Sequence, residues 1–117
     1  MSVPFIDFQQ QNQLIRGEVD IGIKKVFDKD AYRIPISSIK SMIGHTIGAA
    51  GAIQAVACCL ILQKKIIPPT INLYQPDPLC DLDYVANKPR EVDVETIISN
   101  SFGFGSNNAV LVIRRCK

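Results

Sequence analysis

The sequence predicts an α/β domain in which a short mixed sheet packs on a buried apolar helix. The first observation is the run over residues 48–62, which contains no proline and has Gln54 as its only strongly polar side chain. Alanine and leucine in this run favour helix, and a helix that is apolar on every side must be buried. The second observation is a pair of β-rich runs, residues 96–99 and 109–113. The later run has no polar residue, which is typical of a strand covered on both faces.

Composition supports one modest domain and excludes several classes of function. Of the 117 residues, 47% are hydrophobic, and 13 basic and 11 acidic side chains leave a formal net charge of +2. The basic residues occur only in short pairs, whereas a nucleic-acid interface needs a larger basic patch with aromatic residues among it. The sequence has one histidine and no C-x-x-C pair. We therefore expect no zinc site, and no motif requires another metal or an organic cofactor.

Cysteine usage and the first residues indicate a cytoplasmic protein. Cys58 and Cys59 are adjacent inside the apolar run, and we expect both to act as small core hydrophobes rather than disulfide partners. The first residues include Asp7 and no basic segment before an apolar core, so no signal peptide is expected. The apolar run is short for a membrane span and contains Gln54, which favours a buried helix over a span.

Before the apolar helix, the sequence predicts an extension, a helix and a short strand. Residues 1–18 are glutamine-rich with no clear period and are interpreted as a divergent N-terminal extension; residues 19–117 form the domain. Residues 19–27 have apolar positions at helical spacing. Residues 34–39 form a short β-rich run, with Pro35 near its start where a missing N–H does least harm.

After the helix, charged, proline and glycine residues mark the connections. Lys64-Lys65 marks the helix exit, and Pro68-Pro69 prevents continuation because proline lacks the backbone N–H. Residues 82–85 are a candidate strand, and residues 87–91 are polar and turn-like. Residues 102–108 connect the last two strands tightly, through glycines that permit unusual backbone angles.

Three segments of the chain carry recognisable motifs. The first is Ser37-Ser38-Ile39-Lys40-Ser41-Met42-Ile43-Gly44-His45, followed by Gly48-Ala49-Ala50-Gly51. The second is Ile67-Pro68-Pro69-Thr70-Ile71-Asn72-Leu73 with Pro76-Asp77-Pro78, and the third is Ser99-Asn100-Ser101-Phe102-Gly103-Phe104-Gly105. In order and spacing they resemble the second-histidine motif, the loop after the buried helix, and the active-site loop of the β-ketoacyl-acyl-carrier-protein synthases. These are condensing enzymes of the thiolase superfamily, so the resemblance implies the C-terminal part of a thiolase-like fold.

The resemblance also implies a reaction, decarboxylative Claisen condensation in fatty-acid or polyketide synthesis. In that reaction the enolate of a malonyl group on acyl carrier protein attacks an acyl group held on an enzyme cysteine. The residue matching His45 donates a hydrogen bond to the malonyl thioester carbonyl, Lys40 organises the site electrostatically, and the backbone N–H of Phe104 completes an oxyanion hole. The remaining loop residues that the resemblance marks as substrate-binding are Phe102, Gly103, Gly105 and Asn108.

The sequence departs from the family pattern in ways that limit this inference. The first active-site histidine would fall near residues 8–12, which contain none, and the nucleophilic cysteine would lie ahead of residue 1. Covalent catalysis cannot begin without a nucleophile, so this chain by itself is expected not to condense acyl groups. Gln54 stands where many relatives have glutamate, and Ser106 where glycine is usual. The alternative function is a non-catalytic remnant or partner subunit of a condensing enzyme.

Partners and simpler interpretations follow from the same residues. The family implies acyl carrier protein as a partner, and the further partner expected is a second copy of this chain in a homodimer or a complementing N-terminal chain. Without the resemblance, His45 is a helix cap, Lys40 a surface side chain, and residues 102–105 a glycine turn between strands. Two further expectations separate these cases: residues 48–62 are the segment best protected from hydrogen exchange, and Phe104 lines the cavity that holds the His45 ring.

Overall fold

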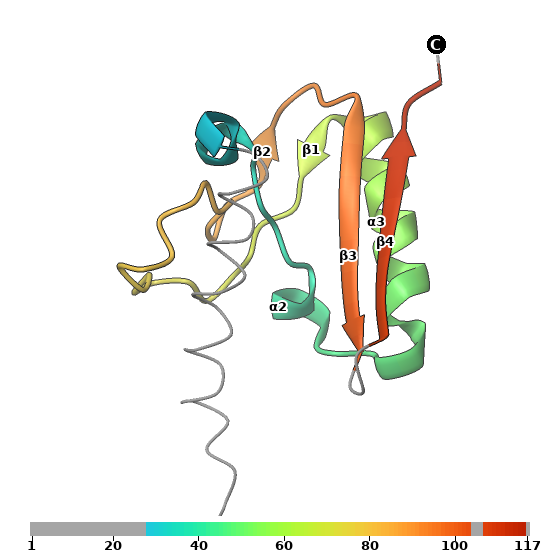
Figure 1. Ribbon diagram of the computed structural model, residues 1–117, viewed down its shortest axis with the longest axis horizontal. Coiled ribbons are helices and arrows are strands. Elements are labelled where there is room, and N and C mark those ends of the chain that lie inside the picture. Colours follow the sequence, from blue (N-terminus) through green and yellow to red (C-terminus); the bar gives the residue numbers. More distant parts are fainter. Residues whose placement is uncertain (1–27, 104–106, 117) are drawn as a thin grey trace, which may run out of the picture. The chain divides into compact units, whose positions relative to one another are not determined.

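The computed structural model describes residues 28–103 and 107–116, which fall into two compact units (Figure 1). The predicted helix over residues 19–27 and the extension over residues 1–18 lie outside this part of the chain. The elements, in order, are η1 (Asp28–Arg33), α2 (Lys40–Ile43), η2 (Ile47–Ala49), α3 (Ala50–Lys64), β1 (Ile66–Ile67), β2 (Arg90–Glu91), β3 (Thr96–Gly103) and β4 (Asn107–Arg114).

One unit comprises, in its described part, residues 28–36 and 75–84. Its small core contains Ala31 and Leu82, which are 0% and 6% exposed. The backbone N–H of Ile36 donates to the carbonyl of Asp83 at 2.8 Å, within an isolated parallel bridge between Ile36 and Tyr84. This bridge replaces the strand predicted over residues 34–39.

The predicted strand does not form because its backbone and side chains bond elsewhere. Pro35 has no N–H to donate, and the Ser37 hydroxyl and Ser38 N–H bond to the Pro68 carbonyl and the Thr70 hydroxyl instead of continuing a ladder. The candidate strand over residues 82–85 is likewise reduced to isolated bridges, of which the second joins Thr70 to Ala86.

The second unit, residues 37–74 and 85–116 in its described part, is built on α3. The sequence predicted this helix, and the observed one is shifted by two residues at each end. It ends at Lys65, whose φ of 59° is left-handed and whose N–H donates to the Ile61 carbonyl at 2.8 Å. A left-handed C-cap residue of this kind satisfies one of the last free carbonyls.

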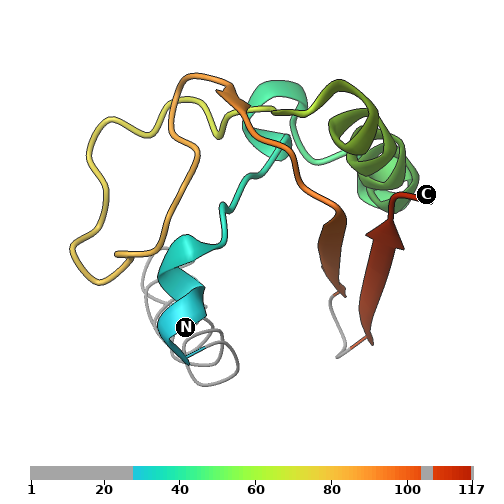
Figure 2. The same ribbon diagram turned by 90° about the horizontal axis from the view of Figure 1, so that it is seen from above.

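The prediction that α3 is buried on every side is wrong. Only Cys58 and Leu62 are buried, whereas Val56 is 60% and Leu60 49% exposed. Because the helix is apolar on all sides, each side needs cover, but the described residues place only one layer, the β3–β4 hairpin, against its length (Figure 2). The remaining apolar faces of α3 face solvent.

The strands form two separate antiparallel pairs rather than the mixed sheet that was predicted. β1 pairs with β2, and β3 pairs with β4 over eight residues, from Thr96 opposite Arg114 to Gly103 opposite Asn107. Among the described residues, parallel pairing occurs only in the isolated bridges. The two long strands were predicted, but each extends beyond its apolar run because the partner strand supplies backbone bonds to the polar ends as well.

The hairpin is covered on one face only. Ile97, Ser99 and Ser101 alternate as the more buried residues of β3, as expected for the face toward α3. On the other face, Val110 and Val112 are 61% and 63% exposed, so the prediction that this strand is covered on both faces is wrong for this chain. The first turn of α3 lies at the end of the hairpin where β3 ends and β4 begins (Figure 1).

One helical segment passes a simple test for a membrane span. Ile47–Lys64 is long and apolar enough to cross a bilayer by length and composition, and 11% of it is buried. A single helix of this kind is weak evidence, because the core helix of a soluble protein passes the same test.

Candidate active site

His45 lies between the end of α2 and the start of η2, with its side chain exposed. The backbone N–H of Ile47 donates to His45 Nδ1 at 3.0 Å. A nitrogen that accepts a hydrogen bond carries no proton, so the imidazole is the neutral tautomer with its proton on Nε2. Within residues 28–103 and 107–116, this arrangement leaves Nε2–H without a hydrogen-bond partner.

The backbone on both sides of His45 adopts uncommon conformations. Gly44 has φ 76° and ψ −177°, a combination open essentially to glycine alone. Ile47 has φ 50°, which is rare for a β-branched residue. The conformation of Ile47 costs about 1–3 kcal/mol and persists only where surrounding structure holds it, whereas glycine has no Cβ and adopts a positive φ without strain. The turn that presents His45 is therefore strained at Ile47, on the C-terminal side of the imidazole.

Lys40 is the first residue of α2 and is half-buried. Its carbonyl accepts a hydrogen bond from Gly44 N–H at 2.9 Å, which closes the single turn of this helix. α2 has four residues, no capping side chain and no buried residue. A helix this short is unstable by itself, so tertiary hydrogen bonds must hold it.

Segment 68–73 supplies those hydrogen bonds, and so the structure brings the first and second sequence motifs together. Ser41 Oγ accepts from the backbone N–H of Ile71 at 2.9 Å and donates to the Ser38 carbonyl at 2.9 Å. The Ser38 N–H donates to Thr70 Oγ1 at 2.9 Å. The two motifs are thus joined by side chains that lie about 30 residues apart in sequence.

Asn87 holds the far end of segment 68–73. The sequence predicted only a polar, turn-like stretch at this position and gave no sign of this role. The Asn87 amide Nδ2 donates to the Leu73 carbonyl at 2.7 Å, and its Oδ1 accepts from Leu73 N–H at 3.2 Å. Its backbone N–H donates to the Thr70 carbonyl at 2.9 Å, with φ at 58°. Asparagine tolerates this left-handed conformation and mimics a paired strand residue, but neither property shows in hydrophobic periodicity.

The third motif lies at the turn end of the hairpin, where β3 ends and β4 begins. Phe102 pairs with Asn108, and Gly103 pairs with Asn107. A Cβ on Gly103 would come within 3.2 Å of the Asn107 carbonyl oxygen, so glycine suits this close approach of the strands. Phe102 is 66% exposed and Asn108 is exposed. Phe104 and Gly105 lie outside the described residues, and the shared pocket of His45 and Phe104 stays a prediction.

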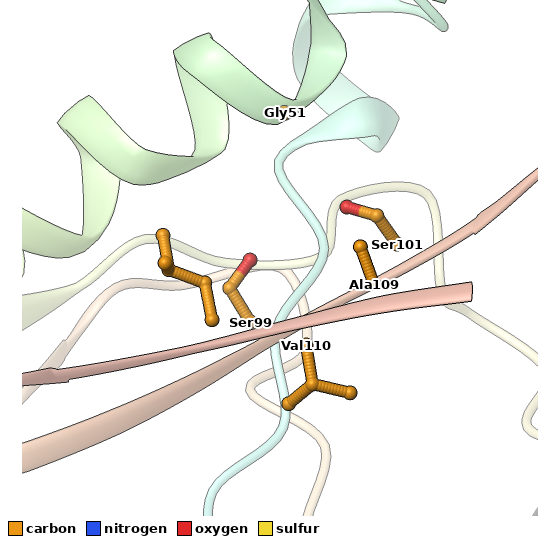
Figure 3. A pocket seen from close by; sticks show the side chains of 6 residues that line it. Gly51, Ser99, Ser101, Ala109 and Val110 are labelled. Atoms are coloured by element: carbon orange, nitrogen blue, oxygen red, sulfur yellow. The ribbon is translucent and has the colours of Figure 1, made fainter. Parts of the chain in front are cut away.

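A cavity of about 270 Å³ lies between the first turn of α3 and the hairpin. Ser99, Ser101 and Ala109 point toward the helix that carries Gly51, whereas Val110 points away (Figure 3). Neither His45 nor Phe102 lines it. Beside it, Gln54 Oε1 accepts from Ser101 Oγ at 3.3 Å, so Gln54 bonds to the hairpin.

The cysteines of α3 differ from one another. Cys58 is buried, and burial raises the pKa of its thiol although a hydrogen bond with Ser99 acts in the opposite direction. Cys59 is exposed, which corrects the expectation that both are core residues. Adjacent helix residues point about 100° apart, so one layer cannot cover both. Within residues 28–103 and 107–116, no three histidine, cysteine or acidic side chains are grouped to hold a metal.

Comparison with known proteins places these motifs among ketosynthases. Residues 18–74 match the family described as "Beta-ketoacyl synthase, C-terminal domain". The chain is 52% identical over 93 residues to 3-oxoacyl-[acyl-carrier-protein] synthase 2 of Coxiella burnetii. It is 48% identical over 94 residues to the tetracenomycin polyketide synthase ketoacyl synthase alpha subunit of Streptomyces glaucescens. Each alignment covers 80% of this chain and 22% of the relative.

Solved structures give the same result for the fold. A type II polyketide ketosynthase in complex with its acyl-carrier protein matches with a TM-score of 0.81 and 42% identity, over 85% of this chain and 24% of that one. The ishigamide ketosynthase/chain length factor matches with a TM-score of 0.79 and 39% identity, over 86% and 25%. The chain therefore spans about a quarter of the length of these structures.

Proposed function

We propose that this chain supplies the second-histidine part of a decarboxylative condensing site. The premise is that it carries a C-terminal region of the β-ketoacyl synthase family and is related to enzymes of fatty-acid and polyketide synthesis. The observation that carries the proposal is the hydrogen bond from Ile47 N–H to His45 Nδ1 at 3.0 Å. It leaves Nε2–H free to donate to the carbonyl oxygen of a malonyl thioester. In the ordinary course of the reaction this oxygen becomes negative.

The chemistry requires such a donor at one moment. When the bond between the malonyl carboxylate and its α-carbon breaks, carbon dioxide leaves and the electron pair enters an enolate whose charge lies on the thioester oxygen. His45 Nε2–H stabilises that oxygen without giving up its proton. The enolate carbon then attacks the carbonyl carbon of an acyl thioester. The C–S bond of that thioester breaks, and the cysteine thiolate that had carried the acyl group is the leaving group. We assign that thiolate and the first histidine to polypeptide other than these 117 residues.

We further propose which parts of the chain serve the rest of the reaction. Lys40 contributes positive charge near His45, and the N–H of Phe104 stabilises the second oxyanion. The substrate-binding residues of the hairpin loop are Phe102, Gly103, Gly105 and Asn108. No metal or organic cofactor takes part. We propose that residues 19–117 form the family portion and residues 1–18 a divergent extension; the family match over residues 18–74 begins close to this boundary.

The partners follow from what the chain leaves exposed. The apolar faces of α3 and of the hairpin have no cover among the described residues, and a complementing N-terminal chain or covalently continuous polypeptide of the same fold would bury them. Acyl carrier protein would deliver the acyl and malonyl groups; one structural relative is a ketosynthase in complex with such a carrier. We propose a cytoplasmic location, as for other enzymes that use soluble carrier-bound substrates.

A second candidate is a non-catalytic partner subunit or remnant of a condensing enzyme. Gln54 favours this candidate, because its amide provides no carboxylate to pair with Lys40 and instead bonds to Ser101 of the hairpin. In this case the chain keeps the fold and contributes an interface. A homodimer of such a subunit would cover the same apolar faces.

A graft separates the two candidates. The 93 aligned residues of this chain replace their counterparts in the Coxiella burnetii enzyme, and β-ketoacyl product is measured with acyl- and malonyl-carrier protein. We expect product from the graft, and a loss of about 10²–10³ in kcat when His45→Ala removes the donor. The matched control is Lys88→Ala, an exposed residue outside the motifs.

Each outcome assigns the function. Product from the graft that depends on His45 supports the condensing role. A folded graft without product that recovers with Gln54→Glu identifies the natural chain as the non-catalytic form. Product that survives His45→Ala at full rate contradicts the proposed donor.

A further inference from the structure

We propose that Ser41 is a positioning residue of this site, whose hydroxyl locks the turn that carries Lys40 and leads into His45 onto segment 68–73. The inference rests on the proposed role of His45 and adds a residue that acts through it. Ser41 stands between the two candidate residues in sequence and belongs to the single turn of α2.

The hydroxyl of Ser41 uses both of its bonding capacities in opposite directions. It accepts from Ile71 N–H at 2.9 Å and donates to the Ser38 carbonyl at 2.9 Å, in a half-buried environment. A serine hydroxyl has one donor hydrogen, and here that hydrogen goes to the Ser38 carbonyl, in the chain leading into α2. The hydroxyl oxygen accepts the hydrogen bond from Ile71, in the distant segment. Ser41 thereby connects two parts of the chain that sequence separates by 30 residues.

Ser37 and Ser38 also bond to segment 68–73, but they lie before α2, and Ser41 makes such a bond from within the helix. α2 has four residues, no capping side chain and no buried residue, so neither helix propagation nor apolar packing holds it. It leads directly into Gly44, whose conformation is open essentially to glycine alone. A strained turn attached to an unstable helix keeps one geometry only if the helix is tied to something stiffer.

Segment 68–73 is that stiffer element. Pro68-Pro69 has fixed φ angles, which removes two backbone freedoms at one end. At the other end, the Asn87 amide bonds both the N–H and the carbonyl of Leu73, at 3.2 and 2.7 Å. In the middle, Thr70 N–H donates to the Val85 carbonyl at 2.8 Å. Ser41 is the side chain of α2 that reaches this segment.

The consequence for the reaction is preorganisation of the donor. A hydrogen-bond donor stabilises a developing oxyanion only from about the right place, and a displacement of about 1 Å can cost on the order of 100-fold in rate. Ser41→Ala removes both hydrogen bonds and leaves Ile71 N–H without its acceptor. Ser41→Thr keeps the hydroxyl, and Ser38→Ala is the matched control because only the backbone of Ser38 takes part in the described bonds.

The first test uses hydrogen exchange in the full 117-residue chain. We expect the amides of Ile71 and Gly44 to exchange about tenfold faster in Ser41→Ala, the loss expected for one net hydrogen bond. Ser41→Thr and Ser38→Ala should retain the wild-type rates at both amides. If Ser41→Ala does not fold, Ser41→Cys keeps the volume but bonds weakly and takes its place. Unchanged Gly44 exchange in a folded variant overturns the proposal.

The second test measures steady-state kinetics in the graft into the Coxiella burnetii enzyme. A positioning role predicts that Ser41→Ala lowers kcat by about 10- to 100-fold with KM within about twofold, and that Ser41→Thr recovers most of it. Equal losses in Ser38→Ala, or a loss in KM alone, overturn it. If the graft with the natural residues forms no product, the proposed condensing role fails, and the exchange rates of Ile71 and Gly44 still decide whether Ser41 holds the turn.

Discussion

The turn around His45 and the layer formed by α3 and the hairpin differ in how far this chain completes them. The turn is tied by polar bonds whose donors and acceptors all lie within the chain, such as Ser41 with Ile71 and Ser38 with Thr70. The layer leaves large apolar side chains uncovered, among them Leu60 and Val110. Hydrogen bonds of the candidate site are therefore satisfied locally, whereas the apolar faces of α3 and the hairpin are left without cover by the residues that the structure describes.

The difference teaches how the site relates to the fold. A two-stranded hairpin is marginal by itself, and one helix against one of its faces buries few side chains. In the described part of the unit that contains α3, the buried apolar residues are Cys58, Leu62, Ile67 and Val85. We infer that the stability of the chain by itself rests on this small set, while the His45 turn is held mainly by polar bonds.

The largest effect is expected from a pair of leucines on the same helix. Leu62 is 6% exposed and Leu60 is 49% exposed. In this chain, Leu62→Ala should cost about 3 kcal/mol of unfolding free energy, and Leu60→Ala less than about 1 kcal/mol. In the graft into the Coxiella burnetii enzyme, Leu60→Ala should become as costly as Leu62→Ala because the exposed face is covered there. Urea unfolding of both proteins measures the four values, and equal costs of the two variants in the chain alone break the comparison.

A pair of glycines gives the next effect. Gly44 has φ 76°, and Gly48 has room around an added Cβ within this chain. Gly44→Ala should destabilise the chain by about 1–3 kcal/mol, whereas Gly48→Ala should change stability by less than about 1 kcal/mol. In the graft we expect Gly48→Ala to become costly as well, since polypeptide that covers the start of α3 should also close the space around η2, which contains Gly48. Thermal unfolding measures both; a neutral Gly44→Ala would show that the turn relaxes freely.

The smallest effect concerns charges at the other end of α3. Asp93 bonds Lys65 Nζ at 2.7 Å and Arg115 Nη1 at 2.8 Å, and these hydrogen bonds, from Lys65 first, lower the pKa of the Asp93 carboxyl. A lowered folded-state pKa stabilises the fold above the unfolded value, about 3.9, and this contribution is lost as pH falls through the folded-state value. Asp93→Asn should lower the Tm slightly at pH 7, less so in high salt, and the difference from wild type should disappear well below pH 4. A difference that grows toward acid pH contradicts the ion pairs.

Sequence predicted those features that are written in local patterns. The apolar run gave α3 within two residues, and the two β-rich runs gave the cores of β3 and β4. The burial of α3 could not be predicted from the run. An apolar composition shows that the helix needs apolar cover, but it does not show whether other residues of this chain pack against it. The ties of Ser41 and Asn87 were not predictable either. Their partners lie 30 and 14 residues away, and only the folded backbone brings them together.

The candidate site was predictable in part for the same reason. His45, Lys40 and the hairpin loop stand in motifs that can be read along the chain. The tautomer of His45 depends on the Ile47 backbone, whose φ of 50° no sequence pattern indicates for isoleucine. Thus the motifs located His45, and the geometry around it determines which imidazole nitrogen carries the proton.

The tautomer of His45 tests the central claim most directly, because this chain has a single histidine and its imidazole nitrogens give unambiguous signals. We would record the ¹⁵N signals of the imidazole in the full chain above the pH at which the ring is protonated. A turn that is completed within this chain predicts a proton on Nε2 and a hydrogen-bonded, unprotonated Nδ1. Protonation on Nδ1, or averaged signals from both tautomers, would contradict a preassembled donor.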